Sequence, residues 1–299
     1  MAINKDSRTI AEQIALLKSR GMLMKDEQTA AFYLNHISYF RLKGYWWDMQ
    51  TDRVNHIFAP NFYFEDVIER YNFDRQLRLI LFDAIEFIEI ALRTKLIYHL
   101  SQAYDGLWYL NDNLVIDKTK HQDCITDLQN EFARSGEGFA KEFRQKYPTD
   151  NPDVWILFEV ATFGTLSKIY SNLKPQIPQK SLITHEFGLN SINDLSSWLA
   201  AISYLRNVIA HHSRVFGRDI LKRPVLPQKP RNQWLQFGVT PIQEKKPFVV
   251  ISTMVYLCNA INPNNGIKNK LLALFNSNPN FPIYKLGFFN NWQQEPLWK

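Results

Sequence analysis

The chain has only two cysteines in 299 residues, Cys124 and Cys258, and they lie far apart in the sequence. This shortage excludes a disulfide framework and argues against a zinc site built from cysteines. No apolar run approaches the roughly 18 residues that a membrane-spanning helix needs. The polar start MAINKDSRTIAEQ does not resemble a secretory signal. We therefore expect a cytoplasmic protein with no membrane partner.

Glycine is also scarce, at 11 residues, whereas aromatic residues make up 14% of the chain. Apolar residues recur mostly at three- and four-residue steps, which predicts an all-α protein. Helices are expected over 7–20, 26–35, 64–103, 117–134, 138–146, 153–173, 178–187, 192–213, 246–261 and 266–275. Asp6 or Ser7 would cap the first of them. The helix over 64–103 contains no Pro or Gly, although a break near Asn72 is an alternative.

Three parts are expected along the chain. Residues 1–62 would form a short N-terminal helical module, and residues 63–275 the main helical domain. Residues 276–299 are irregular but rich in aromatic side chains. Because so many aromatics would be costly to leave in water, we expect this C-terminal tail to pack onto the body of the protein.

Positive charge is concentrated in one segment. The whole chain carries a formal charge of +6, whereas the segment from Arg206 to Lys246 holds nine cations and two acidic residues and so carries +7 by itself. A polyanion is the natural partner for such a segment. The alternative is a solvated basic loop without a ligand.

The basic segment begins at RNVIAHH, residues 206–212, where Arg206 and His211 form an R-x4-H pair. This pair is the signature of a metal-independent ribonuclease site, but the bare pattern is weak evidence because it also arises by chance. On an ideal helix the two side chains are about 140° apart. One regular helix therefore does not direct both at a single atom. A distorted last turn, or two copies of the helix in a dimer, would be needed.

The chemistry that fits this pair is RNA cleavage without a metal or other cofactor. An imidazole can take the proton from a ribose 2′-hydroxyl as that oxygen attacks the adjacent phosphate. A guanidinium can bind two non-bridging oxygens and stabilise the charge that grows on phosphorus. His211 and Arg206 are the candidates for these roles. Asn207, an i, i+4 neighbour of His211, could orient it or hold a phosphate oxygen.

Other interpretations of these residues stay open. His211 could be a surface residue at a helix C-terminus, where cations are favoured, and His212 is either structural or RNA-facing. Further RNA contacts are expected from Arg214, Arg218, Lys222, Arg223, Arg41 and Lys43. The last two lie in YFRLKGYWW, residues 39–47, whose five aromatics either stack on bases or pack in the core.

A second charged pattern lies on the predicted helix over 64–103 and consists of Arg75, Arg78, Glu86, Glu89 and Arg93. These residues lie near one side of the helix. They form either a polar seam that supports the 192–213 helix or touches RNA, or a salt-bridged helix face. Asp74 and Asp83 flank the pattern without forming an obvious pair.

Four segments and the tail carry a family resemblance. They are HISYFRLKGYW (36–46), RYNFDRQLRLILFDAIEFIEIALRTKL (70–96), VWILFEVATFGTLSKIYSNL (154–173), SWLAAISYLRNVIAHHSRVFGRDI (197–220) and YKLGFFNNWQQEPLW (284–298). In this order they resemble the Abi family of bacterial phage-defence proteins, the abortive-infection AbiD/AbiF group. The chain departs from the family pattern at Val215-Phe216-Gly217, where members often carry a Leu-Trp-Asn-like stretch.

The resemblance implies a HEPN-like helical bundle in which R-x4-H marks a ribonuclease that commonly acts through paired units. Arg206 and His211 would be the catalytic pair, followed by Asn207 as the polar residue after the arginine. Because the chain holds no second such pair, a composite site would require a homodimer. A toxin-like role in phage defence is also implied, together with a partner that silences it and a bound structured non-coding RNA.

Three functions are therefore distinguished. The first is an endoribonuclease whose products end in 2′,3′-cyclic phosphate and 5′-hydroxyl groups. The second is the RNA-binding protein component of a ribonucleoprotein, with a silent or inhibited nuclease site. The third is a structural or sensor protein whose basic face meets another protein.

Overall fold

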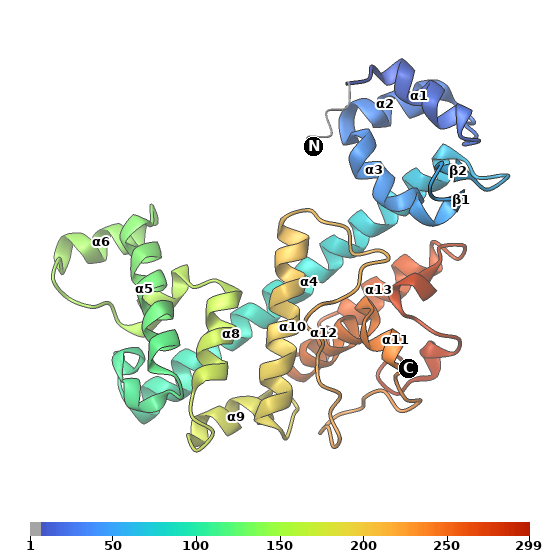
Figure 1. Ribbon diagram of the computed structural model, residues 1–299. Coiled ribbons are helices and arrows are strands. Elements are labelled where there is room, and N and C mark those ends of the chain that lie inside the picture. Colours follow the sequence, from blue (N-terminus) through green and yellow to red (C-terminus); the bar gives the residue numbers. More distant parts are fainter. Residues whose placement is uncertain (1–6) are drawn as a thin grey trace. The chain divides into compact units, whose positions relative to one another are not determined.

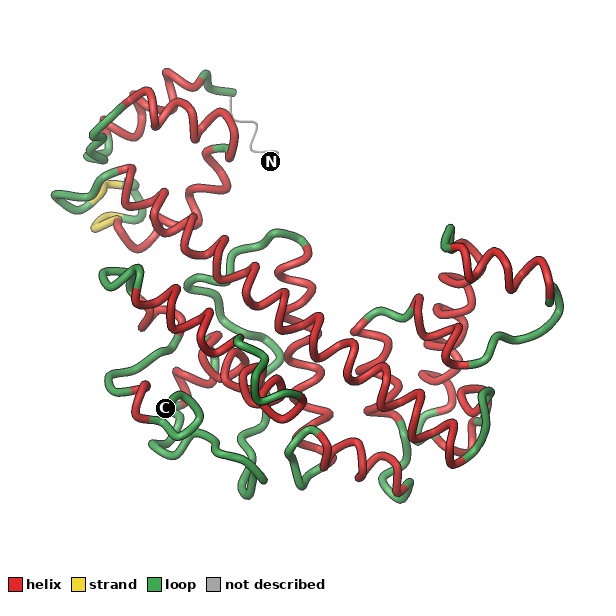
Figure 2. Tube along the Cα trace, turned by 180° about the vertical axis from the view of Figure 1, so that it is seen from behind, coloured by secondary structure: helices red, strands yellow, loops and turns green. Residues whose placement is uncertain are grey.

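The computed structural model describes residues 7–299 (Figure 1). Helices account for most of this part of the chain, and the only strands in it, β1 (Gln50–Asp52) and β2 (Ile57–Phe58), form one small antiparallel hairpin (Figure 2). The prediction of a helical protein is confirmed, whereas the hairpin was not predicted. Within residues 7–299, no helix combines the length and the apolar character that crossing a bilayer requires.

The chain divides into two compact units. Of the described residues, the first contains those up to Leu79 together with Ala273–Phe281, and the second contains Ile80–Leu272 together with Pro282–Lys299. Helices α4 (Phe64–Ala103) and α13 (Ile267–Asn276) each contribute residues to both units. The three parts expected from the sequence stay a prediction, because compactness alone does not show which segments fold independently.

The first unit contains α1 (Ile10–Ser19), α2 (Glu27–Ile37), α3 (Tyr39–Trp46), the hairpin and the first part of α4. Helix α1 begins after Thr9, whose side chain forms a capping box with Glu12. The cap is therefore neither of the expected residues: Ser7 precedes it by two positions, and Asp6 lies outside the described residues. Asp26 caps α2 and accepts from the backbone N–H groups of two residues in its first turn.

The second unit is built around α10 (Ile192–Ala210). Besides its parts of α4 and α13, this unit includes α5 (Lys118–Arg134), α6 (Gly138–Lys146), α7 (Val154–Leu157), α8 (Phe163–Asn172), α9 (Pro178–Glu186), α11 (Pro241–Glu244) and α12 (Pro247–Ile261). Helix α10 packs against α8, α9 and α12, and it buries Leu199, Ile202 and Leu205 completely. This is the apolar face that the three- and four-residue spacing predicted.

The single helix expected over 153–173 is wrong. The segment forms α7 (Val154–Leu157), a 3₁₀ turn (Phe158–Val160) and then α8, with Ala161 in an extended conformation at φ −70°, ψ 133°. The break has a local cause: the Thr162 hydroxyl accepts a hydrogen bond from the backbone N–H of Thr165 at 3.2 Å and so starts a new helix. By contrast, α4 runs unbroken through Asn72.

The C-terminal tail packs onto α12, as expected. The rings of Phe288, Trp292 and Trp298 are buried against one another, with centroids 4.8 Å apart for the first pair and 5.1 Å for the two tryptophans. Phe248 of α12 packs on Phe288 at 4.9 Å. The Trp298 indole also donates to the hydroxyl of Ser252 at 3.2 Å.

Candidate functional site

The R-x4-H pair lies at the C-terminal end of α10. The helix ends at Ala210 rather than at residue 213, and His211 is its C-cap. The His211 N–H still donates to the Asn207 carbonyl at 3.1 Å, so the last turn of the helix is regular. Arg206 and His211 therefore keep the ideal helical separation of about 140°. Of the two arrangements that would bring them to one atom, a distorted last turn is absent.

The chain leaves α10 through a residue in the left-handed region. His212 has φ +53°, and the N–H groups of His212 and Ser213 donate to the carbonyls of Ile209 (2.8 Å) and Val208 (2.9 Å). These two bonds define a Schellman motif, in which glycine usually occupies the position of His212. An L side chain there costs roughly 1 kcal/mol, so the sequence retains a strained histidine at this turn.

Exposure differs among the three candidate catalytic residues. Asn207 and His211 are exposed, whereas Arg206 is half-buried. The charge of Arg206 reaches Glu89 on α4: burial raises the pKa of the Glu89 carboxyl, and the positive charges of Arg93 and Arg206 oppose that rise. The candidate phosphate-binding arginine therefore acts on Glu89 through its charge, whereas the ion pair of Glu89 is with Arg93.

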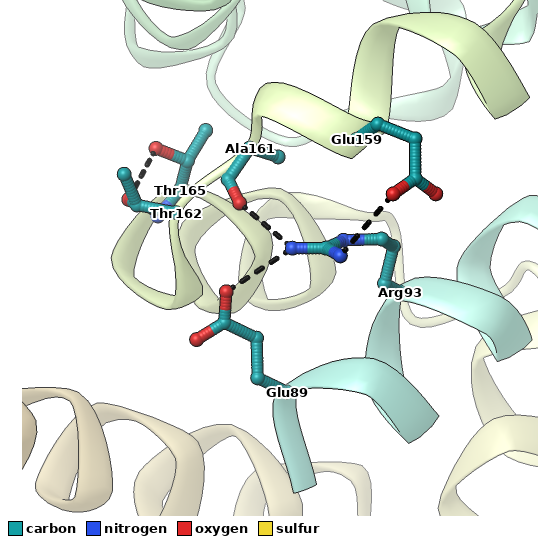
Figure 3. Close-up of polar contacts among 6 residues, drawn as sticks. All are labelled: Glu89, Arg93, Glu159, Ala161, Thr162 and Thr165. Carbon is teal, nitrogen blue, oxygen red and sulfur yellow. Dashed lines mark hydrogen bonds and ion pairs between the residues drawn. The ribbon is translucent and has the colours of Figure 1, made fainter. Parts of the chain in front are cut away.

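Glu89 belongs to a polar cluster that joins α4 to the start of α8 (Figure 3). The Arg93 guanidinium donates to the Glu89 carboxylate at 3.2 Å and to the Ala161 carbonyl at 3.1 Å, and it lies 3.7 Å from the Glu159 carboxylate. Ala161 is the residue at which the 153–173 helix breaks, so the break supplies a carbonyl that no helix bond uses. Sequence reasoning identified Glu89 and Arg93 but missed Glu159 and Ala161.

The start of α8 also touches α10 directly. A methyl group on Gly164 would come within 3.3 Å of the Ser203 hydroxyl oxygen, so the two helices approach closely at this point. Ser203 precedes Arg206 by three residues and so lies on the same face of α10. Gly164 thus allows α8 to approach α10 closely, next to the turn of α10 that carries Arg206. The Glu89–Arg93 cluster, which contacts the start of α8, lies beside this point of approach.

The rest of the charged pattern on α4 has a different role. Arg78 pairs with Asp74 at 3.3 Å, and both side chains are buried in the first unit. The Tyr45 hydroxyl donates to the same carboxylate at 2.8 Å. The sequence predicted no partner for Asp74. Its position facing the core could have been read from its apolar neighbours at helical spacing, although its partner Tyr45 could not.

The basic segment after α10 is a long irregular arm. Part of it is held against α10, because the Trp198 indole donates to the Val225 carbonyl at 2.7 Å and the Val225 N–H donates to the Ser197 hydroxyl at 2.8 Å. Lys222 and Arg223 are exposed, Arg214 is half-buried, and Arg218 donates from its Nε to the Arg214 carbonyl at 2.7 Å. Their predicted contacts with RNA stay predictions.

The aromatic run at 39–47 divides between the core and the surface. Tyr45 and Trp46 are each 1% exposed and pack in the first unit, whereas Phe40 is 84% exposed and Trp47 42% exposed. Of the two cations in the run, Arg41 lies over the Tyr71 ring, 5.9 Å from its centroid, and Lys43 lies over the Trp47 ring at 5.8 Å. Packing in the core is therefore confirmed for Tyr45 and Trp46, whereas stacking on bases stays a prediction for the exposed rings.

Among the described residues, no three His, Cys, Asp or Glu side chains gather in a way that could hold a metal ion. The two cysteines are free and buried. Cys124 lines a cavity of about 610 Å³ between α5 and α8, and Cys258, a residue of α12, is completely buried.

The family model for Abi-like proteins matches residues 32–217 of the chain. This range covers more than half of the sequence, and the chain belongs to the Abi-like protein family. Membership implies a role in phage defence by abortive infection. The matched range includes Arg206, Asn207 and His211 but ends before Arg218. No curated protein sequence and no solved structure matches the chain.

Proposed function

We propose that the chain is a metal-independent endoribonuclease of the HEPN type that cleaves RNA during abortive infection. The observation that carries this proposal is the end of α10, where an exposed His211 and a half-buried Arg206, whose charge acts on Glu89, adjoin the basic arm. A helix C-terminus carries partial negative charge and does not attract phosphate by itself. The phosphate must therefore be bound by side-chain cations. Among the cations of the basic segment, Arg206 is the one that lies within α10.

In this mechanism His211 takes the proton from a ribose 2′-hydroxyl, and the resulting oxygen attacks the adjacent phosphorus. Arg206 stabilises the charge that develops on the non-bridging oxygens. The bond to the 5′-oxygen breaks, and the products carry 2′,3′-cyclic phosphate and 5′-hydroxyl ends. DNA is not cleaved because it lacks the attacking hydroxyl.

The regular last turn of α10 supports a homodimer as the active form. Because Arg206 and His211 point in different directions from one helix, a single phosphate can reach both types of side chain when two copies of the α10 end face each other. Each site then takes its arginine from one subunit and its histidine from the other. A C2 dimer would contain two such sites.

The test is cleavage of an end-labelled RNA by the purified protein, with and without EDTA. Wild-type protein is expected to cleave in both conditions, and Arg206→Ala and His211→Ala to lose about 10²–10⁴-fold in rate. His185→Ala is the matched control, because His185 is an exposed histidine in the last turn of α9. Full activity of His211→Ala, or cleavage that EDTA abolishes, would contradict the proposal.

A second candidate function is the protein component of a ribonucleoprotein, with a nuclease site that is silent or inhibited. The exposed Lys222 and Arg223 on the arm favour it, because they offer positive charge to a polyanion whether or not cleavage occurs. A discrete structured RNA that copurifies with both the wild-type and the Arg206→Ala/His211→Ala protein would support this function.

A further inference from the structure

Helix α3 carries an exposed aromatic face in the first unit. Phe40 and Lys43 are three residues apart on one side of α3, and Trp47, the C-cap of the helix, follows Lys43 by four residues. The opposite side holds Leu42, Tyr45 and Trp46, which are buried. Because this packing fixes the rotation of α3, the Phe40 and Trp47 rings are directed outward by the core on the other face.

The hairpin adds a second cation to the same place. The Arg53 guanidinium lies 5.8 Å from the centroid of the Trp47 ring, the same distance as the Lys43 ammonium, and the His56 ring lies 6.4 Å from it edge to face. Lys43 and Arg53 therefore both lie at the Trp47 ring, and we call these three residues together with the exposed Phe40 of α3 the α3–hairpin surface.

The acidic residues nearby do not neutralise this surface through ion pairs. Asp48 pairs with Arg70 at 2.8 Å. Asp52 accepts from the N–H groups of Val54 and Asn55 and from the Asn55 side chain, at 2.8, 3.0 and 2.6 Å, and so is occupied by its own turn. Among the described residues, Lys43 and Arg53 form no ion pair, which leaves both charges available to a ligand.

We propose that the α3–hairpin surface binds single-stranded nucleic acid, with bases stacked on Phe40 and Trp47 and phosphates bound by Lys43 and Arg53. Aromatic rings that alternate with cations provide both interactions, and neither requires a particular base sequence. Phe40 and Trp47 are seven residues apart at the two ends of α3, which corresponds to about 10 Å along a helix axis. This distance is about the length of three stacked nucleotides.

This binding does not depend on cleavage at Arg206 and His211, so the two proposals can fail separately. Binding is measured in the full-length Arg206→Ala/His211→Ala protein, as the fluorescence anisotropy of a labelled twelve-nucleotide oligouridine at two salt concentrations. Phe40→Ala and Trp47→Ala are each expected to raise Kd about tenfold. Lys43→Gln and Arg53→Gln are expected to reduce the dependence of Kd on salt.

Val54→Ser is the matched control, because Val54 is an exposed apolar residue that follows Arg53 in the hairpin but has no ring on which a base can stack. Its Kd is expected to stay within about twofold of the parent. The proposal would be overturned if the Phe40→Ala and Trp47→Ala proteins had the same unfolding temperature as the parent protein and also bound oligouridine with the same Kd. A third outcome is that the protein binds vesicles containing phosphatidylserine but not oligouridine, and that Val54→Ser abolishes the vesicle binding. This outcome would identify a membrane-docking surface and would also overturn the proposal.

Discussion

The Arg93 guanidinium donates to the Glu89 carboxylate one turn earlier on α4, at 3.2 Å. The same guanidinium donates to the Ala161 carbonyl, and its Nε is buried without a partner. An isolated salt-bridged helix face would be exposed to water and would contribute little to stability. This pair is instead mostly buried, so Glu89 is held in place while its charge acts on Arg206.

Replacing Glu89 with glutamine is expected to lower the rate of RNA cleavage. Glutamine keeps the shape of the side chain but removes the charge that attracts Arg206, so kcat should fall roughly tenfold with little change in KM. Steady-state kinetics on a labelled RNA measure both. Glu86→Gln is the control, since Glu86 is an exposed carboxylate one turn before Glu89 on the same helix. Equal losses in the two variants would show that the effect is general electrostatics.

The pH dependence of stability gives an independent measure of the same group. Because burial raises the pKa of Glu89 in the folded protein, the folded state retains a proton there at pH values where the unfolded chain has lost it. The contribution of Glu89 to the free energy of unfolding therefore falls as pH rises through that window. The difference between wild-type and Glu89→Gln unfolding free energies should change in this direction between pH 4 and 7.

The sequence determined the helices better than it determined their partners. Helix α10 was predictable because its apolar residues follow the helical period, and Arg206 and His211 could be found on it by spacing alone. The buried pair of Asp74 and Tyr45 could not be predicted, because the residues are 29 positions apart and meet only through packing. The break at Ala161 was missed for a related reason: the Thr162 cap competes with an otherwise continuous helical pattern, and Arg93 binds the released carbonyl from another helix.

The composite site predicts that two inactive variants restore each other. In a mixed dimer of Arg206→Ala and His211→Ala subunits, one of the two sites contains both intact residues. Random mixing by unfolding and refolding together should therefore give about a quarter of wild-type cleavage activity, since half of the dimers are mixed. The comparison is with each variant refolded alone. Cleavage that stays at the level of the single variants would exclude a site shared between subunits.

The strained turn at His212 makes a prediction about stability. Glycine reaches φ +53° without the steric cost that a Cβ imposes, so His212→Gly should be more stable than His212→Ala by roughly 1 kcal/mol. Chemical denaturation measures both. At position 210 the preference between glycine and alanine is reversed, because Ala210 is exposed and helical. Ala210→Gly should therefore lower the free energy of unfolding by roughly 1 kcal/mol. Equal stability of the two His212 variants would mean that the turn is not left-handed in solution.

The two cysteines should react with alkylating reagents at very different rates. Burial, with a smaller effect from Asp83, raises the pKa of the Cys258 thiol to about 12. At pH 8 about one Cys258 thiol in ten thousand is therefore the reactive thiolate, and the side chain is also inaccessible. Burial also raises the pKa of the Cys124 thiol, which the charge of Lys168 opposes. Its side chain lines the cavity between α5 and α8, which a small reagent can enter.

Iodoacetamide at pH 8, followed by peptide mass spectrometry, should modify Cys124 at least tenfold faster than Cys258. A Cys124→Ser protein should remain unmodified until it is denatured, and rapid modification of Cys258 in that variant would show that α12 opens in the native state.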